Sequence, residues 1–299
     1  MSTHAPSVPV AGAPAVARRR VPRPVRRRRL LLSIADNSFR IVLAIMFLTP
    51  FVFIVLTSLM TNDQALSTNL WPQPFRWSNY KEVFDRAPIL HYALNTLIYA
   101  SLATLFMLLS SIPVAYALSR LRWKGRDAVF VLVLVAMMLP PQVTIVPLYV
   151  MWAKLDLVGS LAPLIIPNLF GDAFSIFLLR QFFLTIPEPY LDSARVDGCG
   201  EFRILTSVVV RLAKPAIAAV ALFMFLFTYS DFFGPLLYAG DDEAHWTLSV
   251  GLAQFRTLHQ VQWNLTMAAT VLVITPVLVL FFLAQKAFVE GVTLTGVKE

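Results

Sequence analysis

The sequence is poor in charge and nearly lacks cysteine. Only 14% of its 299 residues are charged, whereas an ordinary soluble domain is about one quarter charged. A chain of this size with so few charges lacks the polar residues to cover a soluble globule, which argues against a soluble enzyme. Its single cysteine, Cys199, has no partner for an internal disulfide, so a disulfide-bonded secreted scaffold is excluded.

The sequence also lacks the usual signs of catalysis and of cofactor binding. No Gly-x-x-x-x-Gly-Lys-Ser/Thr phosphate loop occurs, so the chain has no evident means of binding ATP itself. The apolar segments contain no paired nucleophile and base, which argues against an intramembrane enzyme. We therefore predict no catalytic residue, no cofactor and no metal site. The histidines are too scattered for metal-ligand spacing: His4, His91, His245 and His259.

Acidic residues are absent from the first 30 residues, which contain eight arginines. The rest of the chain has 17 basic and 17 acidic residues, so the net charge of +8 belongs to this segment. Its Ala/Pro/Arg composition predicts a disordered tail over residues 1–30. Nucleic-acid binding, a transit peptide and a twin-arginine signal at Arg28-Arg29 are alternatives. We favour a cytoplasmic tail that contacts lipid headgroups, and we expect no nucleic-acid partner.

Long apolar runs, in contrast, are abundant. A membrane-spanning helix needs about 20 largely apolar residues, and the runs are continuous, which favours helices over the alternating strands of a barrel. The sequence therefore predicts an all-α polytopic membrane protein with about six transmembrane helices in a domain over residues 31–299. The predicted spans are 41–62, 92–119, 128–153, 160–183, 215–238 and 261–285. Asp172 and Arg180 interrupt the fourth, and Asp231 lies within the fifth.

The basic residues predict the orientation of these spans. Lysine and arginine are retained on the cytoplasmic side of a membrane. With the N-terminus inside, 20 of the 25 basic residues fall in inner segments and five in outer loops. Both termini are therefore expected in the cytoplasm.

The inner segment from Arg180 to Lys214 is unusually long and structured. Pro189 suits the first turn of a helix, and we expect Asp192 in that turn, where a carboxylate favours the positive helix end. Gly198 and Gly200 supply the backbone freedom to end one short helix and begin another. The segment predicts a helix–elbow–helix. It is either a membrane-surface hairpin without a partner or a surface that binds one.

At this segment the sequence resembles a known family. Asp192-Ser-Ala-Arg-Val-Asp-Gly198 resembles the Glu-Ala-Ala-x-x-x-Gly pattern of the "EAA" loop of ABC-importer permeases. Asp197-Gly198-Cys199 and Lys214-Pro215 are similar to the maltose-type carbohydrate importers. The resemblance covers roughly residues 39–299 and extends to Leu139-Pro140, Ile145–Tyr149, Phe174–Pro187 and Gly291–Lys298.

The resemblance implies a fold, a site and a set of partners. The fold is that of a type I ABC-importer permease in the bacterial plasma (inner) membrane, and residues 186–214 are its coupling loop. The loop would sit in a cleft of a cytoplasmic ATPase, which binds ATP and Mg. Implied partners are a sister permease in a heterodimer, two copies of the ATPase and an extracytoplasmic substrate-binding protein. The matching coupling residues are Asp192, Ser193, Ala194, Asp197, Gly198, Cys199 and Glu201.

Three residues depart from the family pattern. Asp192 stands where glutamate is usual, and Cys199 replaces a small alanine. Arg211 occupies the place where a leucine–proline pair usually ends the motif. This change leaves the second short helix free to continue toward the fifth span, so the family's bend is not predicted there.

Polar groups within the spans are candidates for the substrate pathway, because burying them in a bilayer is costly. Tyr229 and Asp231 combine an aromatic ring with a hydrogen-bonding group, which suits a hydroxyl-rich sugar. As an alternative to contact with substrate, Asp231 lies near the outer interface or pairs with a sister helix. For the amides, the alternative is hydrogen bonding to neighbouring helices, which is common in bundles. The Pro140-Pro141 break is either a pathway-lining kink or simple packing geometry. The remaining pathway candidates are the amides Asn95, Gln142 and Asn168.

Two functions follow from these observations. The first is the permease subunit of a binding-protein-dependent carbohydrate importer, which is itself not an enzyme. The alternative is a stand-alone proton-coupled secondary transporter with Asp172 or Asp231 as its proton relay. That alternative leaves the 180–214 segment without a purpose, and the sequence shows no internal repeat of the kind such carriers have.

Overall fold

The computed structural model describes residues 23–240, 242–253 and 262–296. The chain divides into two units, residues 1–52 and 53–299. Most of helix α1 (Arg23–Ser58) belongs to the first unit, and the apolar side chains of residues 41–53 are largely exposed. Because α1 begins at Arg23, residues 23–30 of the predicted disordered tail are helical. The rest of that tail lies outside the described residues.

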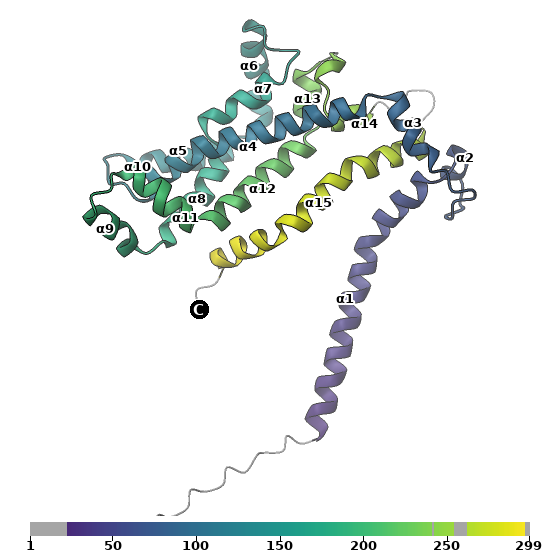
Figure 1. Cartoon of the computed structure of the whole chain (residues 1–299), viewed down its shortest axis with the longest axis horizontal. Coiled ribbons are helices and arrows are strands. Elements are labelled where there is room, and N and C mark those ends of the chain that lie inside the picture. Colours follow the sequence, from purple (N-terminus) through teal and green to yellow (C-terminus); the bar gives the residue numbers. More distant parts are fainter. Residues whose placement is uncertain (1–22, 241, 254–261, 297–299) are drawn as a thin grey trace, which may run out of the picture. The chain divides into compact units, whose positions relative to one another are not determined.

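The second unit is built from helices, and no strand occurs among the residues that the structure describes. This confirms the predicted all-α class. Its elements, labelled in part in Figure 1, are α2 (Asn62–Ala65), α3 (Ser78–Arg86), α4 (Ile89–Ser119), α5 (Arg126–Met138), α6 (Pro141–Lys154), α7 (Ala162–Ile165), η1 (Ile166–Phe170), α8 (Ala173–Thr185), α9 (Glu188–Val196), α10 (Glu201–Ile204), η2 (Leu205–Val209), α11 (Val210–Leu212), α12 (Lys214–Ser230), α13 (Phe233–Tyr238), η3 (Glu243–His245), α14 (Leu248–Ala253) and α15 (Trp263–Gly296).

The described helices include up to six that could cross a membrane by length and composition, in agreement with the predicted number. Four are continuous: Asp36–Ser58, Ile89–Ser119, Ala162–Thr185 and Trp263–Leu283. Two more are bent pairs, Arg126–Met138 with Gln142–Lys154 and Glu201–Leu212 with Lys214–Ser230. In the second pair the apolar crossing is α12, which has no charged residue after Lys214. The predicted start of the last span, Val261, lies outside the described residues.

The break predicted at Pro140-Pro141 is present. The axes of the helices on either side of it differ by 95°. Leu139 and Pro140 both adopt extended backbone, with ψ of 120° and 131°. A proline forces the residue before it out of the helical region, so this dipeptide ends α5 and begins α6.

The fifth span is bounded by a break at each end. The sequence left the family's bend near Arg211 open, and the chain turns by 81° between α11 and α12. Pro215 explains this, because a proline inside a continuous helix would clash with the carbonyl four residues earlier, here that of Arg211. At the other end α12 stops at Ser230, and a separate helix, α13, follows Asp231.

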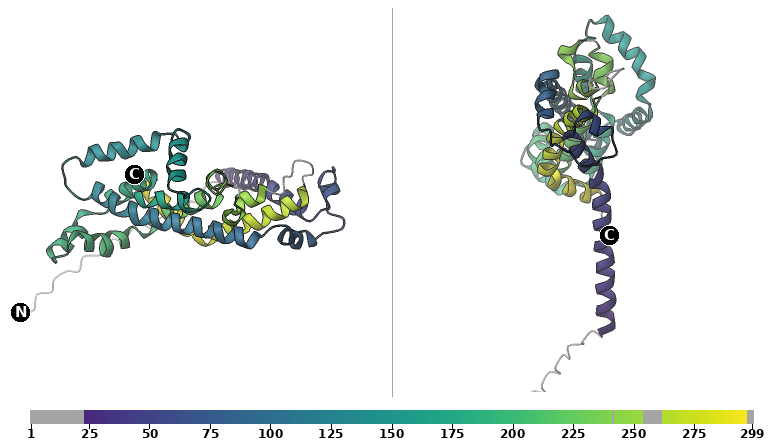
Figure 2. Two further views of the ribbon diagram at one scale, coloured as in Figure 1. Left: turned by 90° about the horizontal axis from the view of Figure 1, so that it is seen from above. Right: turned by 90° about the vertical axis from the view of Figure 1, so that its right-hand side faces the viewer.

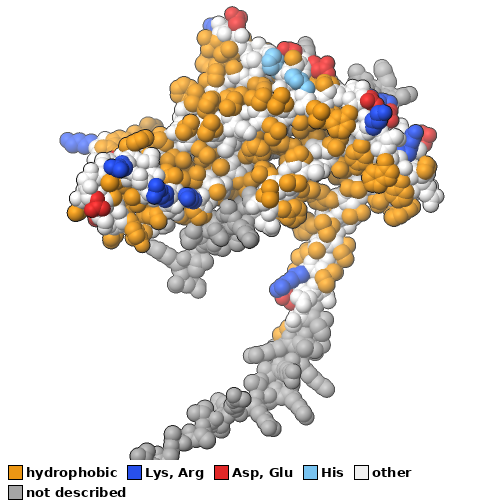
Figure 3. Space-filling view, in the orientation of Figure 1, with side chains coloured by type: hydrophobic (Ala, Val, Ile, Leu, Met, Phe, Trp, Pro, Cys, Tyr) orange, Lys and Arg blue, Asp and Glu red, His pale blue; other side chains and the backbone are white. Residues whose placement is uncertain are grey.

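Helix α4 is the central element of the second unit. It packs against α8 and α12, and α12 packs in turn against α15 (Figures 1 and 2). Three buried apolar clusters lie along α4, and the first of them joins its C-terminal end to α8, α9 and α12. In Figure 3 hydrophobic side chains cover much of the visible face of this unit, with charged side chains toward its edges. Such a surface suits a lipid or protein environment rather than water.

Candidate functional site

The predicted helix–elbow–helix is formed by α9 and α10. Pro187 precedes the first turn of α9, and Pro189 lies within that turn, where a missing N–H costs no hydrogen bond. The helix begins at Glu188, so the carboxylate in the first turn is Glu188. Our placement of Asp192 in that turn is wrong, because Asp192 is the fifth residue of the helix.

Gly198 forms the elbow. Its φ of +78° lies in the left-handed region, which residues with a side chain rarely adopt. The N–H of Gly198 donates to the carbonyl of Arg195, and the N–H of Cys199 donates to that of Ala194, each at 3.0 Å. This paired bonding satisfies the last carbonyls of α9 and stops the helix. Gly200 then leads into α10 in an extended conformation, so the predicted elbow is confirmed.

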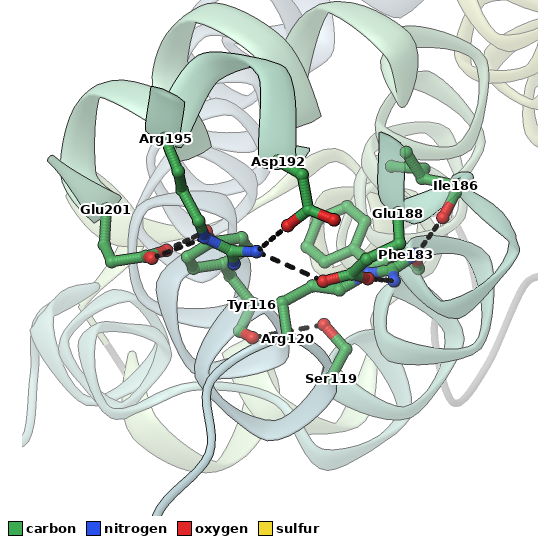
Figure 4. Close-up of polar contacts among 9 residues, drawn as sticks. All are labelled: Tyr116, Ser119, Arg120, Phe183, Ile186, Glu188, Asp192, Arg195 and Glu201. Atoms are coloured by element: carbon green, nitrogen blue, oxygen red, sulfur yellow. Dashed lines mark hydrogen bonds and ion pairs between the residues drawn. The ribbon is translucent and has the colours of Figure 1, made fainter. Parts of the chain in front are cut away.

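Arg195 joins the two sides of the elbow (Figure 4). Its Nε donates to Glu201 Oε1 at 3.1 Å, and its Nη1 donates to Glu188 Oε1 at 3.2 Å and to Asp192 Oδ1 at 2.9 Å. Hydrogen bonds to Glu188 and Glu201 raise the pKa of Arg195 above its already high value. One guanidinium thus holds carboxylates from the start of α9, the middle of α9 and the start of α10.

Glu201 connects this elbow to α4. The Tyr116 hydroxyl, at the buried C-terminal end of α4, donates a hydrogen bond to Glu201 Oε2. That bond, together with the bond from Arg195, holds the pKa of the Glu201 carboxyl below its usual range. Glu201 is the first residue of α10 and precedes the apolar helix α12, so this contact lies ahead of that helix in the chain.

Arg120 makes a second connection, to α8. Its side chain is only 8% exposed, and Nη1 donates to Glu188 Oε2 at 2.7 Å. Its other N–H groups donate to the carbonyls of Phe183 and Ile186, at the C-terminal end of α8, where a cation is favoured. Arg120 therefore ties the ends of α4 and α8 to the start of α9 (Figure 4).

The structure divides the predicted coupling residues between two faces. Asp192, Ser193, Asp197 and Gly198 are exposed, and Ser193 Oγ donates to the carbonyl of Pro189 at 2.7 Å. Half-buried Ala194 and Cys199 pack against the first apolar cluster, and Glu201 makes the contacts given above.

Sequence reasoning missed four residues of this network, Tyr116, Arg120, Glu188 and Arg195. Arg120 was counted only as a charge that sets orientation. For Arg195 a signal was present, since it lies three residues after Asp192 on a helix.

Large apolar side chains project from the tip of this hairpin. Val196 is 88% exposed and Phe202 is 78% exposed, and Tyr190 is also exposed. On the inward side, Leu191 and Ile204 are fully buried. An apolar tip on a hairpin that is fixed from behind is typical of a surface that binds a protein partner. We call Tyr190, Val196 and Phe202 the apolar tip.

Two of the predicted pathway residues hold the helices together. Asn95 Nδ2 donates to the carbonyls of Ala244 and Trp246 at 2.8 and 2.9 Å. The Tyr229 hydroxyl donates to the carbonyl of Val273 in α15 at 2.9 Å. These side chains satisfy backbone groups of neighbouring segments.

Asp231 lies at the junction of α12 and α13. Its Oδ2 accepts a hydrogen bond from the Tyr99 hydroxyl at 3.0 Å, and its Oδ1 accepts one from the Gly234 N–H at 3.1 Å. A Cβ on Gly234 would lie 2.5 Å from Asp231 Oδ2, so the turn is closely fitted. The carboxylate satisfies an N–H in the first turn of α13 and is held by α4.

Asn168 lines a cavity, as Tyr229 lines a different one. The cavity at Asn168 has a volume of about 560 Å³ and lies between α8, α12 and the end of η1. Asp172 at its edge caps α8, accepting hydrogen bonds from the N–H and hydroxyl of Ser175 at 2.7 and 2.6 Å. Gln142, in contrast, is exposed on α6. The cavity combines polar and aromatic side chains: Asn168, Asp172, Phe174, Ser175, Phe223, Met224 and Phe227.

Within the described ranges, no group of three or more His, Cys, Asp or Glu residues is arranged to hold a metal ion.

Comparisons with known proteins bear on this architecture. The profile of one family, described as "binding-protein-dependent transport system inner membrane component", matches residues 111–294. A Bacillus subtilis protein named an arabinooligosaccharides transport system permease is 31% identical over 89% of this chain and 95% of its own. A Thermococcus litoralis trehalose/maltose transport system permease is 31% identical over 91% of this chain and 97% of its own.

A third relative and a solved structure extend the comparison. An sn-glycerol-3-phosphate transport system permease of Yersinia pestis is 31% identical over 74% of this chain and 81% of its own. One chain of a crystal structure, of a bacterial ABC transporter that imports the polysaccharide alginate, superposes with a TM-score of 0.77 at 23% identity. The match covers 88% of this chain and 98% of that one, and it shows the shared fold.

Proposed function

Because the chain belongs to the family of binding-protein-dependent transport system inner membrane components, we propose that it is the permease subunit of an ATP-driven carbohydrate importer. Such a permease is a multi-pass transport subunit and not an enzyme. Relatives named for arabinooligosaccharides and for trehalose/maltose support carbohydrate as the cargo. The relative named for sn-glycerol-3-phosphate supports a sugar-phosphate or polyol-phosphate as the second possibility within the same class.

The observation that carries this proposal is the fixed hairpin with its apolar tip. In our proposal the tip docks into a cytoplasmic ABC ATPase, which holds the ATP and Mg. Because Arg195 and Arg120 fasten α9 to α10, α4 and α8, a displacement of the tip moves those helices with it. That is the mechanical requirement for coupling ATPase closure to rearrangement around a central pathway.

The proposed assembly contains this chain, a sister permease, two copies of the ATPase and an extracytoplasmic substrate-binding protein. One ATPase copy would meet each permease. A solved structure of the alginate transporter holds a periplasmic protein bound to an alginate pentasaccharide, which supports a binding protein as a partner type. The exposed apolar helix surfaces of the second unit support burial against a sister subunit and lipid.

We place the chain in a bacterial inner membrane with both termini in the cytoplasm. The distribution of basic residues supports this orientation. The contacts from Tyr116 to Glu201 and from Arg120 to Glu188 put the end of α4 on the same side as the hairpin. The opposite end of α4, with the exposed Trp71 and Trp77 in the segment before it, would then face the binding protein.

The cavity at Asn168 is our candidate for part of the carbohydrate pathway. Its aromatic rings can stack on sugar faces, and its polar groups can exchange hydrogen bonds with hydroxyls. Asn95, Tyr229 and Asp231 contribute by holding the helices that surround the pathway. Gln142, at the α5–α6 break, remains a prediction.

The alternative of a proton-coupled secondary transporter gains no support. Of its proposed relay residues, Asp172 caps α8, and Asp231 accepts hydrogen bonds from the Gly234 N–H and the Tyr99 hydroxyl. The family match is to binding-protein-dependent systems.

The test is copurification of the ATPase with a variant whose apolar tip is charged. Val196→Asp with Phe202→Asp adds two carboxylates at highly exposed sites, so folding should be preserved while ATPase binding is lost. Leu66→Asp with Leu70→Asp is the matched control, because these leucines are similarly exposed at the other end of the second unit. Undiminished ATPase recovery with the tip variant would contradict the proposal.

A further inference from the structure

The loop between α4 and α5 forms a hollow that the proposed function does not use. The hollow has a volume of about 390 Å³ and is lined by Arg122, Trp123, Gly125, Arg126, Asp127 and Ala128. Trp123 folds back onto α4, where its indole N–H donates to the carbonyl of Ala117 at 3.2 Å, yet its side chain stays 42% exposed. The hollow thus has an aromatic wall and charged walls.

The charge around this hollow is strongly unbalanced. Arg122, Lys124 and Arg126 belong to the loop and the start of α5, and the one carboxylate among them is Asp127. Asp127 Oδ1 accepts a hydrogen bond from Arg126 Nε at 3.0 Å, but the Asp127 side chain is 79% exposed, so water screens this pair. An anion in the hollow would meet more positive charge than Asp127 offsets.

Arg180 adds a further cation at the same place. Its Nε donates to the carbonyl of Leu118 at 3.1 Å, and its guanidinium lies 3.8 Å from the centre of the Phe130 ring. Because Phe130 belongs to α5, this contact holds a cation beside the helix that begins at the hollow, which adds to the positive charge there.

The surroundings of the hollow favour a lipid over a soluble anion. From the hollow α5 continues with the exposed side chains of Val131, Leu132 and Val135, an apolar surface suited to an acyl chain. A tryptophan beside arginines is typical of the membrane interface. Basic pockets between spans on the cytoplasmic side bind the headgroups of anionic lipids.

We propose that this hollow is a binding site for the headgroup of an anionic glycerophospholipid. Arg122 and Arg126 hold the phosphate, and Lys124 adds positive charge in the same loop. Trp123 lies at the glycerol level, and an acyl chain follows the exposed face of α5. The inference rests on the proposed orientation, which puts the hollow at the inner leaflet. Such a lipid would brace the loop that follows Tyr116 and Arg120, the two residues that fasten the hairpin.

The test is photo-crosslinking of lipid to the purified full complex in vesicles. The probe is phosphatidylglycerol with a photoactivatable headgroup, diluted into phosphatidylcholine, and the crosslinked peptides are identified by mass spectrometry. We expect the peptide that contains residues 122–131 to be labelled. Arg122→Gln with Arg126→Gln should weaken the apparent affinity for the probe about thirtyfold, since each basic residue near an anionic surface contributes roughly a factor of five.

Arg76→Gln with Arg86→Gln is the matched control, because it removes the same charge from exposed sites at the other end of α4. It should label like the wild type. Equal labelling of the 122–131 peptide in the Arg122/Arg126 variant would overturn the proposal, and so would equal labelling by a phosphatidylcholine probe. Competition by inorganic phosphate as effective as competition by phosphatidylglycerol would overturn the choice of a lipid. Recovery of the ATPase with the complex is measured in the same preparation. Loss of the ATPase would count against the proposed function, whereas loss of lipid labelling alone would count against the lipid site.

Discussion

Arg195 is the residue on which the shape of the hairpin depends most. It contacts three carboxylates on two helices, but its side chain is one-third exposed. Exposed ion pairs each contribute little to stability, so the importance of Arg195 lies in fixing geometry. The backbone bonds around Gly198 hold the elbow locally, whereas Arg195 sets the angle between α9 and α10.

We therefore predict that Arg195→Ala loosens the hairpin without unfolding the chain. Hydrogen exchange of amides in residues 188–204 should increase, while α4 and α12 stay protected, and ATPase activity should become less dependent on transported substrate. Arg203→Ala, at an exposed arginine of α10, serves as the control. Unchanged exchange in Arg195→Ala would show that the backbone alone holds the elbow.

For Glu201 we predict that its contribution to the stability of the hairpin depends on pH. Its carboxyl has a pKa below the usual range because Tyr116 and Arg195 donate to it. Its stabilising contribution is therefore fully present above the ordinary glutamate pKa of about 4.3, and it is lost as the pH falls through the lowered value.

Hydrogen exchange of residues 188–204, corrected for intrinsic rates, checks this. The difference between wild type and Glu201→Gln should be constant at neutral pH and shrink below about pH 4.3. A difference that vanishes already near pH 6 would contradict the assignment.

At the scale of elements, the breaks between helices are defined by a few side chains. The junction of α12 and α13 depends on Asp231, which Tyr99 and the Gly234 N–H both contact. This arrangement explains a charged residue within a predicted span without any contact with cargo. The same carboxylate could also line the pathway, and a substitution separates the two roles.

Asp231→Asn keeps one oxygen to accept from the Gly234 N–H, and its NH2 group can donate to the Tyr99 hydroxyl oxygen in place of the bond that Asp231 accepts. If the role of Asp231 is to hold this junction, the variant should lose at most about 1 kcal/mol of stability, the scale of a helix-cap substitution, and it should keep the wild-type affinity for cargo. Thermal unfolding and transport at several substrate concentrations provide the two measurements. A large rise in the KM for transport with unchanged stability would instead assign Asp231 to the pathway.

At the scale of the whole molecule, the central question is which side of the membrane each end of α4 faces. Our proposal places the hairpin and the α4–α5 loop inside. A cysteine at Arg203, which is exposed and outside the apolar tip, in a Cys199→Ala background should resist a membrane-impermeant maleimide in whole cells and react after the membrane is opened. A cysteine at Leu70, which is also exposed, should show the opposite behaviour. The reverse pattern would contradict the orientation.

The sequence predicted the features that depend on local chemistry. Uninterrupted apolar runs predicted the spans, the Pro140-Pro141 dipeptide predicted the sharpest break, and Gly198 predicted the elbow. Arg211 left the bend before α12 open, whereas Pro215 is the residue that forbids a continuous helix there.

The contacts of Arg120 and Tyr116 could not be predicted, because their partners lie more than 60 residues away in the chain. The cavity at Asn168 depends in the same way on how α8 and α12 pack. Such contacts follow from the tertiary structure and leave no local pattern.

The fastening of the hairpin has a consequence for protein engineering. Residues 188–204 form one continuous segment that could be exchanged between proteins. The groups that hold this segment nevertheless include Tyr116 and Arg120, at the end of α4, about 70 residues earlier in the chain. Grafting the hairpin alone onto another permease would transfer its exposed surface without Tyr116 and Arg120, which hold it in place. If the hairpin binds the proposed ATPase, a chimera that accepts a foreign ATPase would need both the hairpin and the α4 residues that hold it.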